Sequence, residues 1–209
     1  MQHPALISRA HLTRRRLLRA ASLMPAILAA PSASAIAAAS IDEMVIGNPA
    51  APVTIIEYAS MTCPHCAKFH QTVLPRIKAE LVDTGKVRLI YRDFPLDGLA
   101  VRAAMLARCG GGQRFFAFAD VIYAQQAQWA RAADPLAALR QLGRLGGLSD
   151  QEIEGCLADR ALEDAVLRSR MDGQQKFQID STPAFLINGK RFRGAPEFDA
   201  IRQAIEEAG

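Results

Sequence analysis

No acidic residue occurs among the first 41 positions of this 209-residue chain, and Asp42 is the first. The same stretch carries five arginines, so the formal net charge of +4 comes from the N-terminal segment. Without those five, 20 basic residues stand against 21 acidic ones, which is a net charge of −1. The rest of the chain therefore lacks the basic surplus typical of nucleic-acid-binding proteins.

The N-terminal segment also lacks a hydrophobic run long enough to span a bilayer. Its apolar stretch extends from Ala20 to about Ala30 and is interrupted by Pro25, whereas a membrane helix needs ~20 apolar residues. Basic residues before this stretch and small residues after it are typical of an export signal. We expect residues 1–40 to be that signal and residues 41–209 to form one domain.

The arginine-rich stretch from Thr13 to Arg19 resembles a twin-arginine signal, and a general secretory signal is the alternative. We expect cleavage after one of three alanines that each end an Ala-x-Ala pattern: Ala35, Ala37 and Ala39. Export would place the cysteines in an oxidising compartment, where disulfides form and persist.

The mature part of the chain has no internal repeat and no low-complexity linker. A β-branched run predicts a strand over 53–59, apolar spacing predicts a helix over 66–82 with a kink at Pro75, and a second strand is expected over 87–94. Strand, helix and strand make a right-handed parallel unit. No strand pattern interrupts residues 99–175, so we expect a helical insertion there. One of its helices should start at a capping box formed by Ser149 and Glu152.

The C-terminal part predicts a hairpin and a helix. Strands are expected over 184–187 and 191–193, joined around Asn188-Gly189, a preferred two-residue hairpin turn. A last helix should begin at Pro196. The predicted order is βαβ, helical insertion and ββα, which is an α/β fold.

The chain contains only four cysteines and a single CxxC motif, Cys63-Pro64-His65-Cys66. It falls between a strand and a helix, where free N–H groups and the positive end of the helix dipole favour a thiolate. Cys63, at the exposed end and near His65, would attack, and Cys66, one turn further, would resolve the mixed disulfide. Pro64 suits the first turn because its missing N–H is not needed there. The motif predicts a redox-active pair.

Two other interpretations of this motif are open. Cys63 and Cys66 could bind zinc with His70, but a structural zinc site wants a second ligand pair, and the chain has none. We therefore expect no metal site, and His70 should be a solvated or core-edge residue. A purely structural Cys63–Cys66 bridge would close a tiny loop and add little stability.

Three features carry a resemblance to a known family: the CPHC motif at 63–66, the segment Ser181-Thr182-Pro183 before a strand, and the helical insertion. With these, the chain resembles the DsbA-like proteins of the thioredoxin superfamily over essentially the whole mature part. The resemblance implies a thioredoxin fold in which Pro183 is a cis-proline facing the cysteines. Thr182 would then pair its backbone with an extended substrate peptide. By local sequence alone, Thr182-Pro183 is also a proline beginning a strand.

Glu57 lies six residues before Cys63. The resemblance implies that it is the buried acid beneath the resolving cysteine, where it exchanges a proton with Cys66. The alternative is an edge position at which Glu57 pairs with Lys86 or Arg88.

Cys109 and Cys156 both fall in the predicted insertion, 47 positions apart. Some relatives carry a second disulfide in such an insertion, and a bridge here would contribute ~4 kcal/mol on the loop-entropy model. The alternative is two unpaired buried cysteines.

The resemblance implies a monomeric periplasmic thiol:disulfide oxidoreductase that oxidises unfolded or reduced exported proteins. It would need no cofactor besides its redox-active disulfide, and a DsbB-like membrane protein would re-oxidise it. A disulfide isomerase or reductase is the main alternative, because threonine also precedes the cis-proline in isomerases. Only about a dozen residues separate the expected cleavage site from Val53, too few for the N-terminal dimerisation domain of such isomerases. A non-redox binding module and a zinc-binding chaperone are further alternatives, opposed by the intact CxxC motif and the cysteine count.

Overall fold

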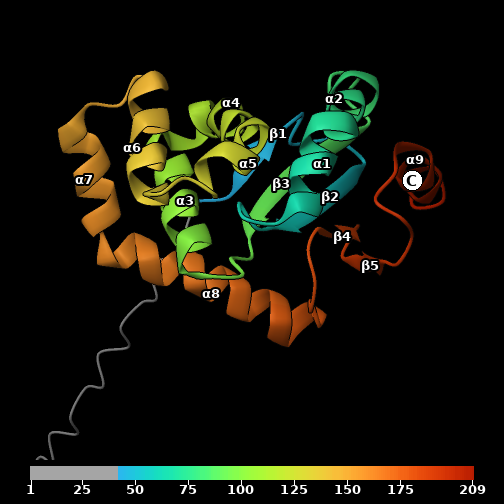
Figure 1. Cartoon of the computed structure of the whole chain (residues 1–209). Coiled ribbons are helices and arrows are strands. Elements are labelled where there is room, and N and C mark those ends of the chain that lie inside the picture. Colours follow the sequence, from blue (N-terminus) through green and yellow to red (C-terminus); the bar gives the residue numbers. More distant parts are fainter. Residues whose placement is uncertain (1–41) are drawn as a thin grey trace, which may run out of the picture. The chain divides into compact units, whose positions relative to one another are not determined.

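The computed structural model describes residues 42–209, so the predicted signal and its cleavage sites lie outside the described residues. The described part is a mixed α/β fold built on one five-stranded sheet (Figure 1), with strand order β1-β3-β2-β4-β5. The predicted βαβ and ββα halves and the helical insertion between them are confirmed. In chain order the strands are β1 (Met44–Ile46), β2 (Val53–Ala59), β3 (Val87–Asp93), β4 (Ala184–Ile187) and β5 (Lys190–Phe192).

Strand β2 lies at the centre of the sheet, parallel to β3 and antiparallel to β4. Its side chains alternate between the two faces, as in any strand, so Glu57 shares a face with Ile55, while Tyr58 points to the other. Glu57 is paired with Tyr91 on β3 and with Phe185 on β4. An edge position for Glu57 is therefore wrong, because hydrogen-bonded strands flank it on both sides.

Strand β1 was not predicted from the sequence. It has only three residues and pairs antiparallel with β3. A segment this short offers no periodic pattern, and the partner strand decides its conformation.

The helix after β2 is divided into three pieces: α1 (Pro64–Thr72), α2 (Leu74–Ile77) and the π-helical η1 (Lys78–Val82). The sequence predicts one helix with a kink at Pro75. Because proline lacks an N–H and its ring crowds the carbonyl four residues before it, α1 stops at Thr72 and α2 starts one residue before Pro75. Gly85 follows η1 with φ +76°, a conformation that favours glycine.

Six helices form the insertion, and most begin at a side chain that caps the free N–H groups of the first turn. Asp97, Asp134 and Asp159 accept such hydrogen bonds, and the capping box that Ser149 and Glu152 predict is present. The helices are α3 (Gly98–Cys109), α4 (Gly111–Ala124), α5 (Gln126–Trp129), α6 (Pro135–Leu145), α7 (Asp150–Ala158) and α8 (Arg160–Phe177).

The long helix α8 leads from the insertion back to the sheet (Figure 1). Gly173 of α8 packs so closely on β2 that an added Cβ would lie 2.8 Å from Cε1 of Tyr58 and 3.3 Å from Cδ2 of Phe94. Tyr58 and Phe94 form a buried cluster on this face of the sheet. The absence of a side chain at Gly173 therefore lets α8 approach the sheet.

The C-terminal hairpin and helix follow the predicted order with small shifts. The second strand is β5 at Lys190–Phe192 rather than 191–193, and α9 (Phe198–Glu206) begins two residues after Pro196. Asn188 and Gly189 of the turn both have positive φ, as this kind of hairpin turn needs. Glu197 is the N-cap of α9.

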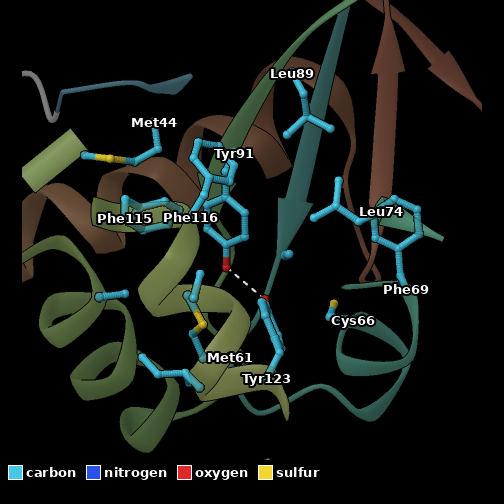
Figure 2. Close-up of a cluster of buried hydrophobic side chains, with 14 of the residues drawn as sticks. Met44, Met61, Cys66, Phe69, Leu74, Leu89, Tyr91, Phe115, Phe116 and Tyr123 are labelled. Atoms are coloured by element: carbon cyan, nitrogen blue, oxygen red, sulfur yellow. Dashed lines mark hydrogen bonds between the residues drawn. The ribbon is translucent and has the colours of Figure 1, made fainter. Parts of the chain in front are cut away.

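The main core lies between the sheet and the helices α1, α3, α4 and α9. Figure 2 shows Tyr91 of β3 pointing toward Tyr123 of α4, and the two hydroxyl oxygens are 2.9 Å apart. The sulfur of Cys66 reaches into the same cluster, near Phe69 and Leu74. The helix that carries the CxxC motif is thus anchored in the core while its N-terminus remains at the surface.

Candidate active site

The CxxC motif begins at the junction of β2 and α1. Cys63 is the N-cap of α1 and Pro64 is its first residue, as predicted. The carbonyl of Cys63 accepts the N–H of Ala67 at 3.1 Å, which closes the first helical turn. Both thiols of the motif are free, so this is the dithiol form. Pro64 and His65 are exposed and lie between two buried cysteines.

Cys63 is less exposed than expected, with only 5% of its surface accessible. In the protonated form its Sγ donates to the carbonyl oxygen of Thr182 at 3.3 Å, so the loop before β4 covers the sulfur. The peptide bond between Thr182 and Pro183 is cis. The structure thus brings the two motifs that carry the family resemblance into direct contact.

The pKa of Cys63 is lowered to about 5, chiefly by a hydrogen bond from the Cys66 thiol. Burial opposes this change, and the hydroxyl of Thr182 and the backbone N–H groups of His65 and Cys66 support it. Thr182 Oγ1 has no hydrogen-bond partner among the described residues, so its hydroxyl is free to turn toward the Cys63 sulfur. Cys63 is therefore almost entirely thiolate at neutral pH, as a nucleophilic or leaving thiol needs to be.

Cys66 has the opposite behaviour. It is fully buried, and burial raises the pKa of its thiol well above the usual value, with further contributions from Cys63 and from the charge of Glu57. A thiolate that forms at Cys66 will therefore take up a proton. The two cysteines differ in the way required of an attacking thiol and a resolving thiol.

Glu57 is fully buried, and its Oε1 lies 3.2 Å from Nε2 of His70. Its other oxygen, Oε2, has no hydrogen-bond partner among the described residues. The expected alternative partners are elsewhere: Lys86 is exposed, and Nε of Arg88 donates to Thr54 Oγ1. The pairing of Glu57 with Lys86 or Arg88 is therefore wrong.

His70 is not the solvated or core-edge residue that the sequence suggested. It is buried in α1, 4% exposed, between Glu57 and Asp120. Burial lowers the pKa of His70, but the carboxylates of Glu57 and Asp120 outweigh it, so the pKa is raised overall. No group of three acidic, histidine or cysteine side chains that could hold a metal ion occurs in residues 42–209.

Gln126 is a site residue that sequence reasoning missed. Its buried amide Nε2 donates to the carbonyls of Met61 at 2.8 Å and Cys63 at 3.0 Å, so α5 holds the loop that enters the CxxC motif. A polar residue in a helical stretch carries no local signal of this contact, because its partners lie more than 60 positions away.

Cys109 and Cys156 form a disulfide that joins α3 to α7, with their Cα atoms 6.0 Å apart. Beside it, the buried guanidinium of Arg108 donates to Asp93 Oδ2 at 2.6 Å and ties α3 to β3. The insertion is therefore held both internally and against the sheet.

None of the helices in the described part of the chain has the length and apolarity needed to cross a membrane. The thioredoxin family model matches residues 39–207. A Rickettsia typhi protein named as a protein-disulfide oxidoreductase is 35% identical over 169 residues, covering 80% of this chain and 62% of that protein. This chain thus spans about three fifths of the length of the first curated relatives it matches.

Solved structures with this fold include Wolbachia pipientis α-DsbA1, which is 30% identical, with a TM-score of 0.74 over 80% of this chain and 90% of that one. BdbD from Bacillus subtilis, at 22% identity and a TM-score of 0.71 over 79% of this chain and 92% of that one, shares the fold. With the CPHC motif placed at the start of α1, the chain belongs to the thioredoxin family and, within it, to the DsbA-like proteins.

Proposed function

We propose that this chain is an exported thiol:disulfide oxidoreductase that introduces disulfide bonds into reduced, unfolded proteins through Cys63 and Cys66. One observation carries the proposal: Cys63 lies at the N-terminus of α1 against Thr182 and the cis-proline, whereas Cys66 is fully buried. In these positions the pKa of Cys63 is lowered to about 5 and that of Cys66 is raised. A thiol of low pKa is a good leaving group, which makes its disulfide a strong oxidant of other thiols.

The reaction proceeds in two exchanges from the oxidised form. A substrate thiolate attacks Sγ of Cys63, the Cys63–Cys66 bond breaks, and the Cys66 thiolate leaves and takes up a proton. A second substrate thiolate then attacks the substrate sulfur of the mixed disulfide and expels the Cys63 thiolate. The substrate's two thiols become a disulfide, and the enzyme ends as the dithiol.

The proposal also gives roles to the residues around the two cysteines. His65 and the helix N-terminus favour the Cys63 thiolate, and Pro64 fits the first turn. The backbone of Thr182, beside the cis-proline Pro183, is placed next to Cys63 Sγ, where an extended substrate can pair with it as an added strand. Glu57 exchanges the proton with Cys66.

The cellular setting is part of the proposal. Residues 1–40 direct export, and the protein works as a monomer in the periplasm on unfolded or reduced exported proteins. A DsbB-like membrane protein re-oxidises it. Isolation of the periplasmic form should give an N-terminus after Ala35, Ala37 or Ala39. A full-length chain retained in the cytoplasm would contradict export.

The decisive experiment separates an oxidase from an isomerase or reductase. We expect equilibration with glutathione buffers to give a potential well above the ~ −270 mV of thioredoxin. One test substrate protein, offered either reduced or with scrambled disulfides, should be oxidised rapidly but repaired poorly. A potential near that of thioredoxin, or repair equal to that of a dedicated isomerase, would overturn the oxidase assignment. The Cys63→Ser variant is the inactive control.

A further inference from the structure

A row of titratable side chains leads from the buried carboxyl group of Glu57 to the surface. Glu57 and Cys66 are both fully buried, and His70 lies four positions after Cys66 on the same face of α1. Glu57 Oε1 lies 3.2 Å from His70 Nε2. On the other side of the ring, His70 Nδ1 lies 3.5 Å from Asp120 Oδ1, an ion-pair distance at which neither atom has a hydrogen-bond partner among the described residues. Asp120 Oδ2 in turn accepts from Lys78 Nζ at 2.7 Å. The four side chains come from four elements: Glu57 from β2, His70 from α1, Asp120 from α4 and Lys78 from η1.

The outer end of this row reaches solvent and the inner end does not. Glu57 and His70 have side chains that are at most 1% exposed, whereas the side chain of Asp120 is 42% exposed. Lys78, its partner, lines a surface hollow of about 670 Å³ together with Asp83 and Phe116. A path from solvent toward Cys66 can therefore begin at Asp120, away from the Thr182 loop that covers Cys63.

The surroundings of His70 hold the imidazole in one orientation. Its ring stacks on Tyr123 with centroids 4.1 Å apart and meets the edges of Phe69 and Tyr91. The titratable or charged groups that face it are Glu57, Asp120, Tyr91 and Tyr123, with Lys78 behind Asp120. Each nitrogen of this fixed ring thus has one carboxylate beside it.

We propose that His70 and Asp120 relay protons between solvent and Glu57. Protons can then reach and leave buried Cys66 through α1 and α4 even while a substrate covers Cys63 beside Thr182. The inference rests on the proposed role of Glu57. His70 and Asp120 act through Glu57 and touch no substrate. Glu57 Oε2, the oxygen without a partner among the described residues, exchanges with Cys66, while Oε1 exchanges with His70.

The proton count balances in each half of the cycle. When the Cys66 thiolate leaves, Glu57 gives it the proton on Oε2, His70 passes the proton on Nε2 to Oε1, and Nδ1 receives one from solvent through Asp120. When Cys66 must be deprotonated during re-oxidation, every transfer runs in reverse. The imidazole therefore returns to its starting tautomer without rotating, which suits a ring held by stacking.

The test uses the full mature protein and small reagents. Reduction by dithiothreitol measures protonation of the Cys66 thiolate, and resolution of a glutathione mixed disulfide measures its deprotonation. We expect Asp120→Asn and His70→Gln to slow both steps roughly tenfold or more, since positioned acid–base groups contribute 10²–10⁴. Asp83→Asn, the same change at an exposed acid of the hollow that Lys78 lines, should leave both rates unchanged.

Two readouts separate a relay from a structural ion pair. In Asp120→Asn the rates should rise with imidazole concentration, because a diffusible buffer replaces the missing entry group, whereas the wild-type rates should not. Alkylation of Cys63 by iodoacetamide should keep its rate and its pH midpoint in both variants. Two results for Asp120→Asn would overturn the relay: unchanged rates of both steps, or slower rates that imidazole does not restore. Both results can be obtained even if His70→Gln fails to fold.

This experiment is independent of the direction of the physiological reaction. Dithiothreitol and glutathione react with the pair whether the protein is an oxidase or an isomerase, so failure to oxidise the test substrate protein overturns only the oxidase assignment. If Glu57→Gln leaves both rates unchanged, the role of Glu57 fails and the relay with it.

Discussion

The side-chain amide of Gln126 donates a hydrogen bond to the backbone carbonyl of Cys63, across 63 positions of sequence. The same amide donates to the carbonyl of Met61, so one residue of the insertion holds both ends of the short loop that enters the CxxC motif. The insertion therefore contacts the candidate active site directly.

Replacing Gln126 by alanine should destabilise the protein. The change removes the hydrogen bonds from Gln126 to two carbonyls. The carbonyl of Cys63 keeps the N–H of Ala67, whereas the carbonyl of Met61 loses its bond to Gln126, and a buried group left without a partner costs about 1–3 kcal/mol. Urea unfolding should show this loss in the free energy of unfolding. The exposed Gln128, also in α5, is the matched control, and Gln128→Ala should stay within about 0.5 kcal/mol of wild type. Equal effects of both variants would contradict the role of Gln126.

The stability of the reduced form should depend on pH through Cys63. Because the pKa of Cys63 is about 5 in the folded protein and lies near 9.0 without the fold, the unfolded chain binds more protons between these values. Stability therefore rises with pH across this window and is lost as pH falls through about 5. The oxidised form has no such group, so the reduced form should gain stability relative to it from pH 4 to pH 8.

Urea unfolding of both redox forms at pH 4 and pH 8 measures this gain. His70 and other groups that are present in both redox forms contribute to both free energies of unfolding, so their contributions largely cancel when the oxidised value is subtracted from the reduced one. In the Cys63→Ser variant, the increase in the free energy of unfolding between pH 4 and pH 8 that the reduced wild type shows should disappear. A pH-independent difference between the wild-type forms would show that the Cys63 thiolate is not stabilised by the fold.

Two glycine-to-alanine changes in helices should act with opposite sign. Alanine is favoured over glycine in a helix interior by about 1 kcal/mol. At Gly155 of α7 an added Cβ meets nothing within 4 Å, so Gly155→Ala should raise the melting temperature. At Gly173 the Cβ would lie 2.8 Å from the buried Tyr58 ring, and overpacking typically costs 1–3 kcal/mol. A stabilised Gly173→Ala variant would contradict the close approach of α8 to the sheet.

The Cys109–Cys156 disulfide should appear as a crosslinked pair in non-reduced peptide maps of the isolated protein. Replacing both cysteines by serine should lower the free energy of unfolding by up to ~4 kcal/mol, because the bridge closes a loop of 47 positions. The double variant Cys63→Ser/Cys66→Ser is the control and should keep the crosslink. Free thiols at both positions in the isolated wild type would contradict the bridge.

The local sequence determined those features that depend on neighbouring residues. The β-branched run at 53–59, the capping box at Ser149 and the Asn188-Gly189 turn are each confirmed as predicted, because each is a property of a few successive residues. The same holds for the placement of the CPHC motif at a helix N-terminus, since an N-terminal proline and the apolar stripe that follows it mark the start of α1.

Only the tertiary structure decided how these pieces meet. Cys63 is covered by Thr182, 119 positions away, so its low exposure could not be read from the exposed end of a helix. Strand β1 forms because β3 offers it an edge, and Gly173 is required because two rings of another part of the chain lie against it. A histidine in the sequence does not reveal whether its side chain is solvated or buried, so the position of His70 could not be predicted. Its position between Glu57 and Asp120 follows from the packing of α1 and α4 on the sheet, and such contacts leave no pattern in any one segment.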